Sequence, residues 1–349
     1  MTPQRLASLV AHLFLGFLGG LVADRAGLPM PFLLGALMAV APLIIWQGAR
    51  GVPTLQFPRG MRFAFVGIIG TLIGMSFTPD LLAKLPSLWI SLLLVVVFVV
   101  AAHALGYTVY RRVGGYDRVT ALYGSMPGGL IEGVSLGEQA GGNPMLLTVH
   151  HFARIVIVVF SVPLLFVLVA GETVGSAAGF SVGAGEAGPL DTAGIIALTA
   201  AGLVLGKICR LPAWHLTGGL LLAAVVHGAG WMSLTGPGWL VDLAQLVVGT
   251  ALATQFTGAS PRVLSRAFGL TLVAVSAMFV AAALLALLVT RLTPLSYPAA
   301  FISFAPGGVA EMGLIALSLD ASPVIVAAHH LLRIVITVVL VRVADAQMR

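Results

Sequence analysis

Long apolar stretches recur along the whole chain, separated by short polar or glycine-rich segments. A helix needs about 20 apolar residues to cross a bilayer, and twelve segments have roughly that length and character. Six lie in the first half, at 6–23, 29–47, 60–77, 86–110, 118–138 and 144–170. Six lie in the second half, at 190–208, 213–233, 239–257, 264–290, 296–318 and 323–343. The pattern predicts an all-α, polytopic membrane protein.

The two halves are copies of one sequence. A shift of 179 positions, the distance from Pro127 to Pro306, aligns a Pro-Gly-Gly motif, a glutamate and a His-His-x-x-Arg motif without a gap. The aligned residues are Pro127, Gly128, Gly129, Glu132, His150, His151 and Arg154 in the first copy, and Pro306, Gly307, Gly308, Glu311, His329, His330 and Arg333 in the second. Ionisable residues are rare within membrane helices, so this match is not accidental. We predict two repeats, 1–170 and 191–349, joined by a Gly-rich acidic linker at 171–190.

The distribution of Lys and Arg bears on the orientation of the two copies. These residues prefer cytoplasmic loops near helix ends, and Arg5 suggests a cytoplasmic N-terminus. If all six elements of each copy cross the membrane, the copies are parallel. If the fifth element is broken or re-entrant, the copies are inverted. Of the Lys and Arg residues other than the intramembrane Arg154 and Arg333, only Arg25, Lys84 and Arg291 then lie outside the cytoplasm. This second arrangement fits the rule better, and it also places the linker, which lacks Lys and Arg, in the periplasm.

The fifth element of each copy carries the Pro-Gly-Gly motif in its centre. Proline removes a backbone donor and glycine weakens a helix, so we expect a break or a re-entrant turn there. Such a break survives in the membrane only within protein or beside a wet cavity, and it exposes amides that attract anions. Paired breaks at matching positions are typical of a transporter's central site. The predicted substrate-binding residues are Pro127, Gly128, Gly129, Arg154, Pro306, Gly307, Gly308 and Arg333.

The other ionisable residues of the motifs allow three interpretations. In the first, Glu132–Arg154 and Glu311–Arg333 are structural latches that hold the breaks. In the second, the glutamates and histidines carry protons while arginine fixes an anionic solute, because His and buried Glu can titrate near neutral pH. In the third, the four His and two Glu bind a metal, although adjacent histidines on one helix point in different directions. The candidate coupling residues are Glu132, Glu311, His150, His151, His329 and His330; we assign no metal ligand and no catalytic residue.

Composition narrows the choice of function. The chain is 59% hydrophobic and 9% charged with a mean hydropathy of +1.07, whereas soluble domains carry about 25% charged residues. The single cysteine, Cys209, excludes an internal disulfide and a cysteine-based metal cluster. No basic patch on a soluble face is expected, which argues against nucleic-acid binding.

The duplicated motifs also carry a family resemblance. The segments Ser-Met-Pro-Gly-Gly-Leu-Ile-Glu and Ala-Pro-Gly-Gly-Val-Ala-Glu-Met, each followed by His-His-x-x-Arg, resemble the AbrB-type membrane proteins of bacteria. These have been described as duplicated membrane domains, as ammonia monooxygenases and as regulators. The resemblance implies a bacterial inner-membrane protein. The plan is also similar to transporter folds with inverted five-helix repeats, a likeness that transfers no substrate.

Taken together, these observations favour a secondary transporter for a small anionic organic solute, coupled to H⁺ or Na⁺. Its partners would be the solute, the coupling ion and the lipid bilayer, without nucleic acid and without a cofactor; analogy alone suggests a homodimer. A membrane protein that regulates gene expression indirectly is the first alternative. A membrane-embedded, metal-dependent monooxygenase is the weaker one, since no redox motif is present.

Overall fold

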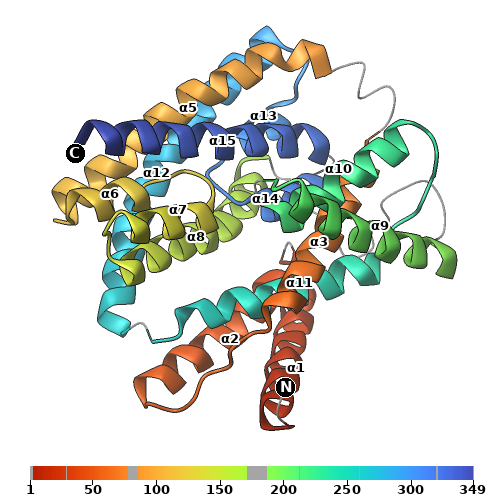
Figure 1. The fold of residues 1–349 in the computed structure, drawn as a ribbon, viewed down its shortest axis with the longest axis horizontal. Coiled ribbons are helices and arrows are strands. Elements are labelled where there is room, and N and C mark those ends of the chain that lie inside the picture. The colour runs from red at the N-terminus through yellow and green to blue at the C-terminus, as the bar shows by residue number, and fades with distance from the viewer. Residues whose placement is uncertain are drawn as a thin grey trace. The chain divides into compact units, whose positions relative to one another are not determined.

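The structure is a computed structural model, and it describes residues 3–28, 30–77, 85–170, 187–211, 213–258, 260–319 and 321–348. Within these ranges the chain is helical and forms no strand (Figure 1). The predicted all-α fold is therefore confirmed. Most of the predicted linker, 171–186, lies outside the described residues.

The helices follow the predicted segments closely. The first copy contains α1 (Pro3–Arg25), α2 (Pro31–Ala49), α3 (Arg59–Met75), a 3₁₀ turn (Leu85–Leu88), α5 (Trp89–Thr108), a π-helical turn (Val109–Val113), α6 (Arg118–Gly124), α7 (Leu130–Gln139) and α8 (Pro144–Ala170). The second contains α9 (Pro189–Ile208), α10 (Trp214–Gly228), α11 (Gly238–Ala253), a 3₁₀ turn (Thr254–Phe256), α12 (Pro261–Leu292), α13 (Tyr297–Phe304), α14 (Val309–Ser318) and α15 (Pro323–Met348).

The helix boundaries reproduce the duplication. Helices α6, α7 and α8 begin at Arg118, Leu130 and Pro144, and α13, α14 and α15 begin 179 positions later. Helices α7 and α14 also have the same length, 10 residues each. The last three helices of the two copies therefore begin with the same spacing.

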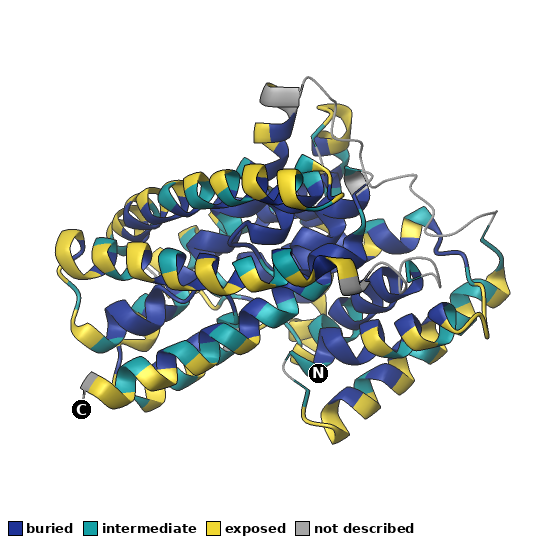
Figure 2. Cartoon of the chain, turned by 90° about the horizontal axis from the view of Figure 1, so that it is seen from above, coloured by how far each residue is buried: buried dark blue, intermediate teal, exposed yellow. Residues whose placement is uncertain are grey.

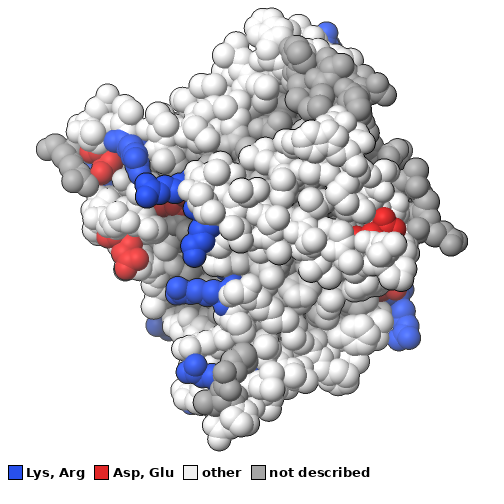
Figure 3. Space-filling model, turned by 45° about the vertical axis from the view of Figure 1, so that its right-hand side comes forward, with Lys and Arg blue, Asp and Glu red and all other residues white. Residues whose placement is uncertain are grey.

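Eight helices of the described chain are long and apolar enough to cross a membrane. Their outer faces carry large apolar side chains, such as Phe14, Leu284 and Val339, which are more than half exposed. Figure 2 shows buried and exposed residues alternating along the helices, and charged atoms are sparse on the face drawn in Figure 3. Burying such surfaces requires lipid, so the chain is a membrane protein.

The chain forms two compact units, each built from both copies. Unit 1 comprises 1–83, 169–260 and 313–324, and unit 2 comprises 84–168, 261–312 and 325–349. In unit 1, α3 packs against α9 and α10 of the other copy, and α11 packs against α1 and α2. In unit 2, α5 packs along α12. The two copies therefore exchange helices.

Glycine permits the close approach of helices in unit 1. Gly70 of α3 lies against the carbonyl of Leu216 in α10, where a side chain would collide with backbone. The equivalent Gly249 of α11 meets the carbonyl of Leu33 in α2, 2.5 Å from where a Cβ would stand. A rigid backbone atom cannot move aside, so both positions require glycine.

Candidate functional site

Both predicted interruptions are present in the structure. Helix α6 ends at Gly124, and α7 begins at Leu130 after a non-helical stretch. In the second copy α13 ends at Phe304 and α14 begins at Val309. Gly129, directly before α7, has φ +69°, a conformation that side chains with a Cβ rarely adopt. Each Pro-Gly-Gly motif lies in unit 2 and separates two short helices.

An arginine from the following long helix satisfies backbone carbonyls of each break. Arg154 of α8 donates from Nη1 to the carbonyl of Met126, the residue before Pro127. Arg333 of α15 donates from Nη1 to the carbonyl of Ala305, the residue before Pro306, at 2.5 Å. Its Nη2 also donates to the carbonyl of Gly307. The guanidinium groups replace donors that a continuous helix would supply in a medium without water.

A histidine assists the first break in the same way. Pro127 has no N–H to donate to the carbonyl four residues earlier, that of Tyr123, whose backbone donor is instead the N–H of Met126 at 3.4 Å. His151 Nε2 lies 3.1 Å from this carbonyl oxygen and donates to it. His151 is fully buried and its Nδ1 has no hydrogen-bond partner. The motif residue is thus tied to the backbone of the break.

The two breaks come together around the arginines. A Cβ built on Gly128 of the first copy would lie 3.1 Å from Nε of Arg333 of the second copy. Arg154 and Arg333 are close enough to act on each other electrostatically, although both are almost entirely buried. In each, Nε has no hydrogen-bond partner. The arrangement places two cations and unused donors between the paired breaks.

The glutamates occupy equivalent positions at the start of α7 and α14. Glu132 and Glu311 are the third residues of these helices, and both carboxylates fold back over the glycine that precedes the helix, Gly129 or Gly308. Negative charge at this point is favoured by the helix dipole. Glu311 is buried and Glu132 is half-buried.

The arginine contacts differ from the simple latch hypothesis. That hypothesis pairs Glu132 with Arg154 inside one copy. In the structure the hydrogen bond of Arg154 goes to a carbonyl, and the carboxylate that acts on it electrostatically is Glu311 of the other copy. This electrostatic interaction therefore links the two repeats.

The histidines of the two copies have unequal surroundings. His150 is held by side chains of other elements, Thr271 and Tyr116. His329 and His330 bond instead through Nδ1 to carbonyls of their own helix, Ile325 and Val326. In the described residues, no three His, Cys, Asp or Glu side chains gather as metal ligands would.

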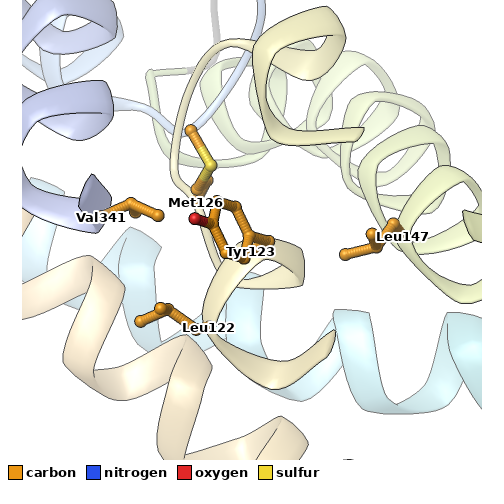
Figure 4. Packing of buried hydrophobic residues seen from close by; sticks show 5 residues of the cluster. All are labelled: Leu122, Tyr123, Met126, Leu147 and Val341. Carbon is orange, nitrogen blue, oxygen red and sulfur yellow. The ribbon is translucent and has the colours of Figure 1, made fainter. Parts of the chain in front are cut away.

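An apolar cluster anchors the first break. Figure 4 shows Leu122 and Tyr123 of α6 and Met126 of the break together with Leu147 of α8 and Val341 of α15. All five are almost completely buried. Met126 presents its carbonyl to Arg154 while its side chain packs in this cluster, so the break is fixed by packing as well as by hydrogen bonds.

Comparison with known proteins agrees with the duplicated motifs. A family model described as "Transition state regulatory protein AbrB" matches residues 32–347. The chain belongs to the AbrB family. It is 25% identical to "Uncharacterized protein YhjN" of Bacillus subtilis (strain 168), over 92% of this chain and 88% of that protein. It is 24% identical to "Putative regulator AbrB" of Escherichia coli (strain K12), over 88% and 86%. The resemblance predicted from the motifs is confirmed.

Sequence reasoning missed three residues that surround His150. Tyr110, Tyr116 and Thr271 bond to one another or to His150, but they belong to no duplicated motif. At a shift of 179 positions, Tyr110 and Tyr116 correspond to Val289 and Leu295. A search for matched residues cannot find a polar group that only one AbrB repeat carries.

Proposed function

We propose that this AbrB-family protein is a secondary transporter that binds a small organic anion between the paired breaks, in the bacterial inner membrane and with its N-terminus in the cytoplasm. The observation that carries the proposal is the meeting of two buried arginines with the two Pro-Gly-Gly breaks in unit 2. A transporter needs such a polar site within the bilayer.

Charge supports an anionic solute. A cation at the centre of a membrane costs at least about 2.5 kcal/mol on insertion scales, and Arg154 and Arg333 also repel each other. Glu311 provides negative charge near Arg154. The carboxylate of a solute would provide the same charge, and the breaks add two helix N-termini that favour anions.

The two arginines differ in how many donors they have free. Arg333 donates to two carbonyls and is 1% exposed, whereas Arg154 donates to one and is 5% exposed. A guanidinium offers five N–H groups in a planar fork that suits a carboxylate. We therefore assign solute binding chiefly to Arg154, and the support of the second break chiefly to Arg333.

Coupling follows from competition at Arg154. If a solute carboxylate replaces Glu311 beside the guanidinium, Glu311 loses its cation and becomes easier to protonate. Uptake of a proton, or of Na⁺, would then accompany binding of the anion. Pro127, Gly128, Gly129 and their counterparts shape the site, and the proposal includes no enzymatic step and no cofactor.

Alternating access would use the two units as the moving bodies. Each unit takes equivalent helices from both copies, as expected for repeats that are related by a two-fold axis. We further propose that the copies are inverted, because that topology leaves only Arg25, Lys84 and Arg291 outside.

Uptake by proteoliposomes tests the proposal. The purified protein would be reconstituted and assayed with a panel of radiolabelled mono- and dicarboxylates under an inward proton or Na⁺ gradient. We expect accumulation of at least one compound, which Arg154→Gln abolishes and the exposed control Arg112→Gln leaves unchanged. Accumulation of none of the compounds, or an undiminished rate with Arg154→Gln, would refute the assignment.

A regulatory role is the second candidate, favoured by the family description and by the name of the Escherichia coli relative. The described chain offers no soluble module for reading DNA, so we propose that any effect on gene expression follows from transport. A deletion strain complemented with Arg154→Gln should then keep the regulatory defect. Full complementation by that variant would separate regulation from transport.

A further inference from the structure

A chain of hydrogen bonds runs through His150, from a surface loop into unit 2. Tyr116, in the half-buried loop after the π-helical turn, places its hydroxyl 3.0 Å from Nε2 of His150. Nδ1 of the same ring lies 2.7 Å from Oγ1 of Thr271 in α12. The hydroxyl of Tyr110 donates to Oγ1 of Thr271 at 3.3 Å. Four side chains from four elements thus form one continuous series.

The donors in this series can all point the same way. Because Tyr110 donates to Thr271, the Thr271 proton is free to point at Nδ1 of His150. The ring then carries its proton on Nε2 and donates to Tyr116, which in turn donates outward. A proton that reaches Tyr110 from the side of the break crosses the series when each group passes on one proton and receives another, so no group ionises permanently. The imidazole is then left with its proton on Nδ1. Rotation of the hydroxyls together with a half-turn of the imidazole ring restores the starting state.

The two ends of the series lie in different surroundings. Tyr116 is partly exposed, whereas His150, Thr271 and Tyr110 are almost completely buried. Tyr110 lies on the π-helical turn, where an N–H···O bond joins Gly114 to Val109, and its ring reaches Gly124, the last residue before the first break. Turns of this kind often occur at functional sites. The series therefore leads from the surface towards the break.

The groups around His150 leave few other routes for a proton. On α8, His151 and Arg154 follow His150. The ring centroids of Tyr110 and Tyr116 lie 4.3 and 5.2 Å from that of its imidazole. Helix α12 contributes Thr271. Arg266 of α12 and Arg111 of the π-helical turn bond to backbone oxygens of the loop, at Gly114 and Tyr116. None of these cations contacts the imidazole in the structure, so its two nitrogens serve the series.

The described residues of the second copy form no equivalent series. His329 bonds to the carbonyl of Ile325 in its own helix, and the counterparts of Tyr110 and Tyr116 are Val289 and Leu295. The two histidines therefore differ in their partners, and the series through His150 is not one of the contacts that the duplication repeats.

We propose that Tyr116, His150, Thr271 and Tyr110 form a proton-conducting path between the membrane surface and the first break. The inference rests on the proposed transport function, to which it adds H⁺ as the coupling ion and one route for that ion. The two links to His150, at 2.7 and 3.0 Å, have the usual hydrogen-bond length, and the Tyr110–Thr271 link is longer at 3.3 Å. Hydroxyl and imidazole groups can each donate and accept, as the path requires.

Proton flux into proteoliposomes tests the path directly. Vesicles containing the full-length protein and a trapped pH-sensitive dye would be given an inside-negative potential with K⁺ and valinomycin. We expect faster acidification than in protein-free vesicles. Thr271→Val or Tyr116→Phe, each of which removes one link, should lower the protein-dependent rate by about tenfold.

Two variants control for indirect effects. Thr271→Ser keeps the hydroxyl and should keep the proton flux. A loss of flux in Thr271→Val but not in Thr271→Ser is therefore attributed to the missing hydroxyl. Tyr107→Phe removes a hydroxyl that makes no hydrogen bond within the described part of the chain, and it should not change the rate. Flux no faster than in empty vesicles, or a wild-type rate in both Thr271→Val and Tyr116→Phe, overturns the path. If the protein binds a carboxylate but conducts no protons, the path is refuted and the transporter proposal stands. If it conducts protons but binds no carboxylate, the transporter proposal is refuted and the path stands.

Discussion

Removal of Arg333 should destabilise the protein through the second break. In Arg333→Met the carbonyls of Ala305 and Gly307 each lose a hydrogen bond in a buried setting, but the Ala305 carbonyl keeps the backbone N–H of Gly307 as a donor. A buried carbonyl left without a partner costs about 1–3 kcal/mol and a lost hydrogen bond about 0.5–1.5 kcal/mol, so the substitution should cost about 1.5–4.5 kcal/mol. Arg154→Met removes the arginine donor from the carbonyl of Met126 and should cost about 1–3 kcal/mol. Arg333→Met should therefore be the less stable of the two variants.

Equilibrium unfolding in mixed detergent micelles measures this difference. Arg291→Met provides a matched control, because Arg291 is exposed in the last turn of α12 and its loss should change stability by less than about 0.5 kcal/mol. The reasoning fails if Arg333→Met is as stable as the wild type. It also fails if Arg154→Met is clearly the less stable of the two, since the carbonyl contacts would then not decide stability.

Three further predictions concern packing, pH and topology. Gly70→Ala and Gly249→Ala should each destabilise unit 1 by about 1–3 kcal/mol in the same unfolding assay, because the added Cβ meets backbone atoms. Gly60→Ala is the control: Gly60 lies on α3, as Gly70 does, nothing lies within 4 Å of its added Cβ, and the substitution should be neutral or stabilising. Desolvation acts to raise the pKa of Asp117, but hydrogen bonds from Thr120 and neighbouring backbone outweigh it and hold that pKa below its usual range. The ionised Asp117 carboxylate therefore stabilises the folded state fully at neutral pH, and this stabilisation is lost as pH falls below about 4. Asp117→Ala should lower the free energy of unfolding by about 1 kcal/mol at pH 7 and by less at pH 3.5. A periplasm-active reporter inserted in the 171–190 linker should be active if the copies are inverted, and activity only of a cytoplasmic reporter there would exclude that topology.

Much of the fold could be predicted because membrane helices are constrained by simple rules. Hydropathy located the spans, and the rare ionisable residues fixed the register of the duplication at 179 positions. Proline and glycine located the interruption between Gly124 and Leu130, because both weaken helices wherever they occur. These properties are local and act through the backbone.

The partners of the motif residues could not be predicted in the same way. The sequence suggested that Arg154 pairs with Glu132, its neighbour in the repeat, but hydrogen bonding to the Met126 carbonyl depends on how the break turns. The position of Arg333 against Gly128 depends on how the two copies exchange helices. The path through Thr271 joins residues 121 positions apart and has no duplicate, so no pattern in the sequence pointed to it.

Binding of a carboxylate at Arg154 is the most direct test of the proposed site. Apparent melting temperatures of the wild type, Arg154→Gln and Arg112→Gln would be measured with the same carboxylate panel at two pH values. A ligand at a hundred times its Kd stabilises the folded state by about 2.7 kcal/mol, which such a measurement detects readily. We predict that at least one carboxylate stabilises the wild type and Arg112→Gln but not Arg154→Gln. Equal stabilisation of all three proteins, or stabilisation of none, would contradict an anion site between the two breaks.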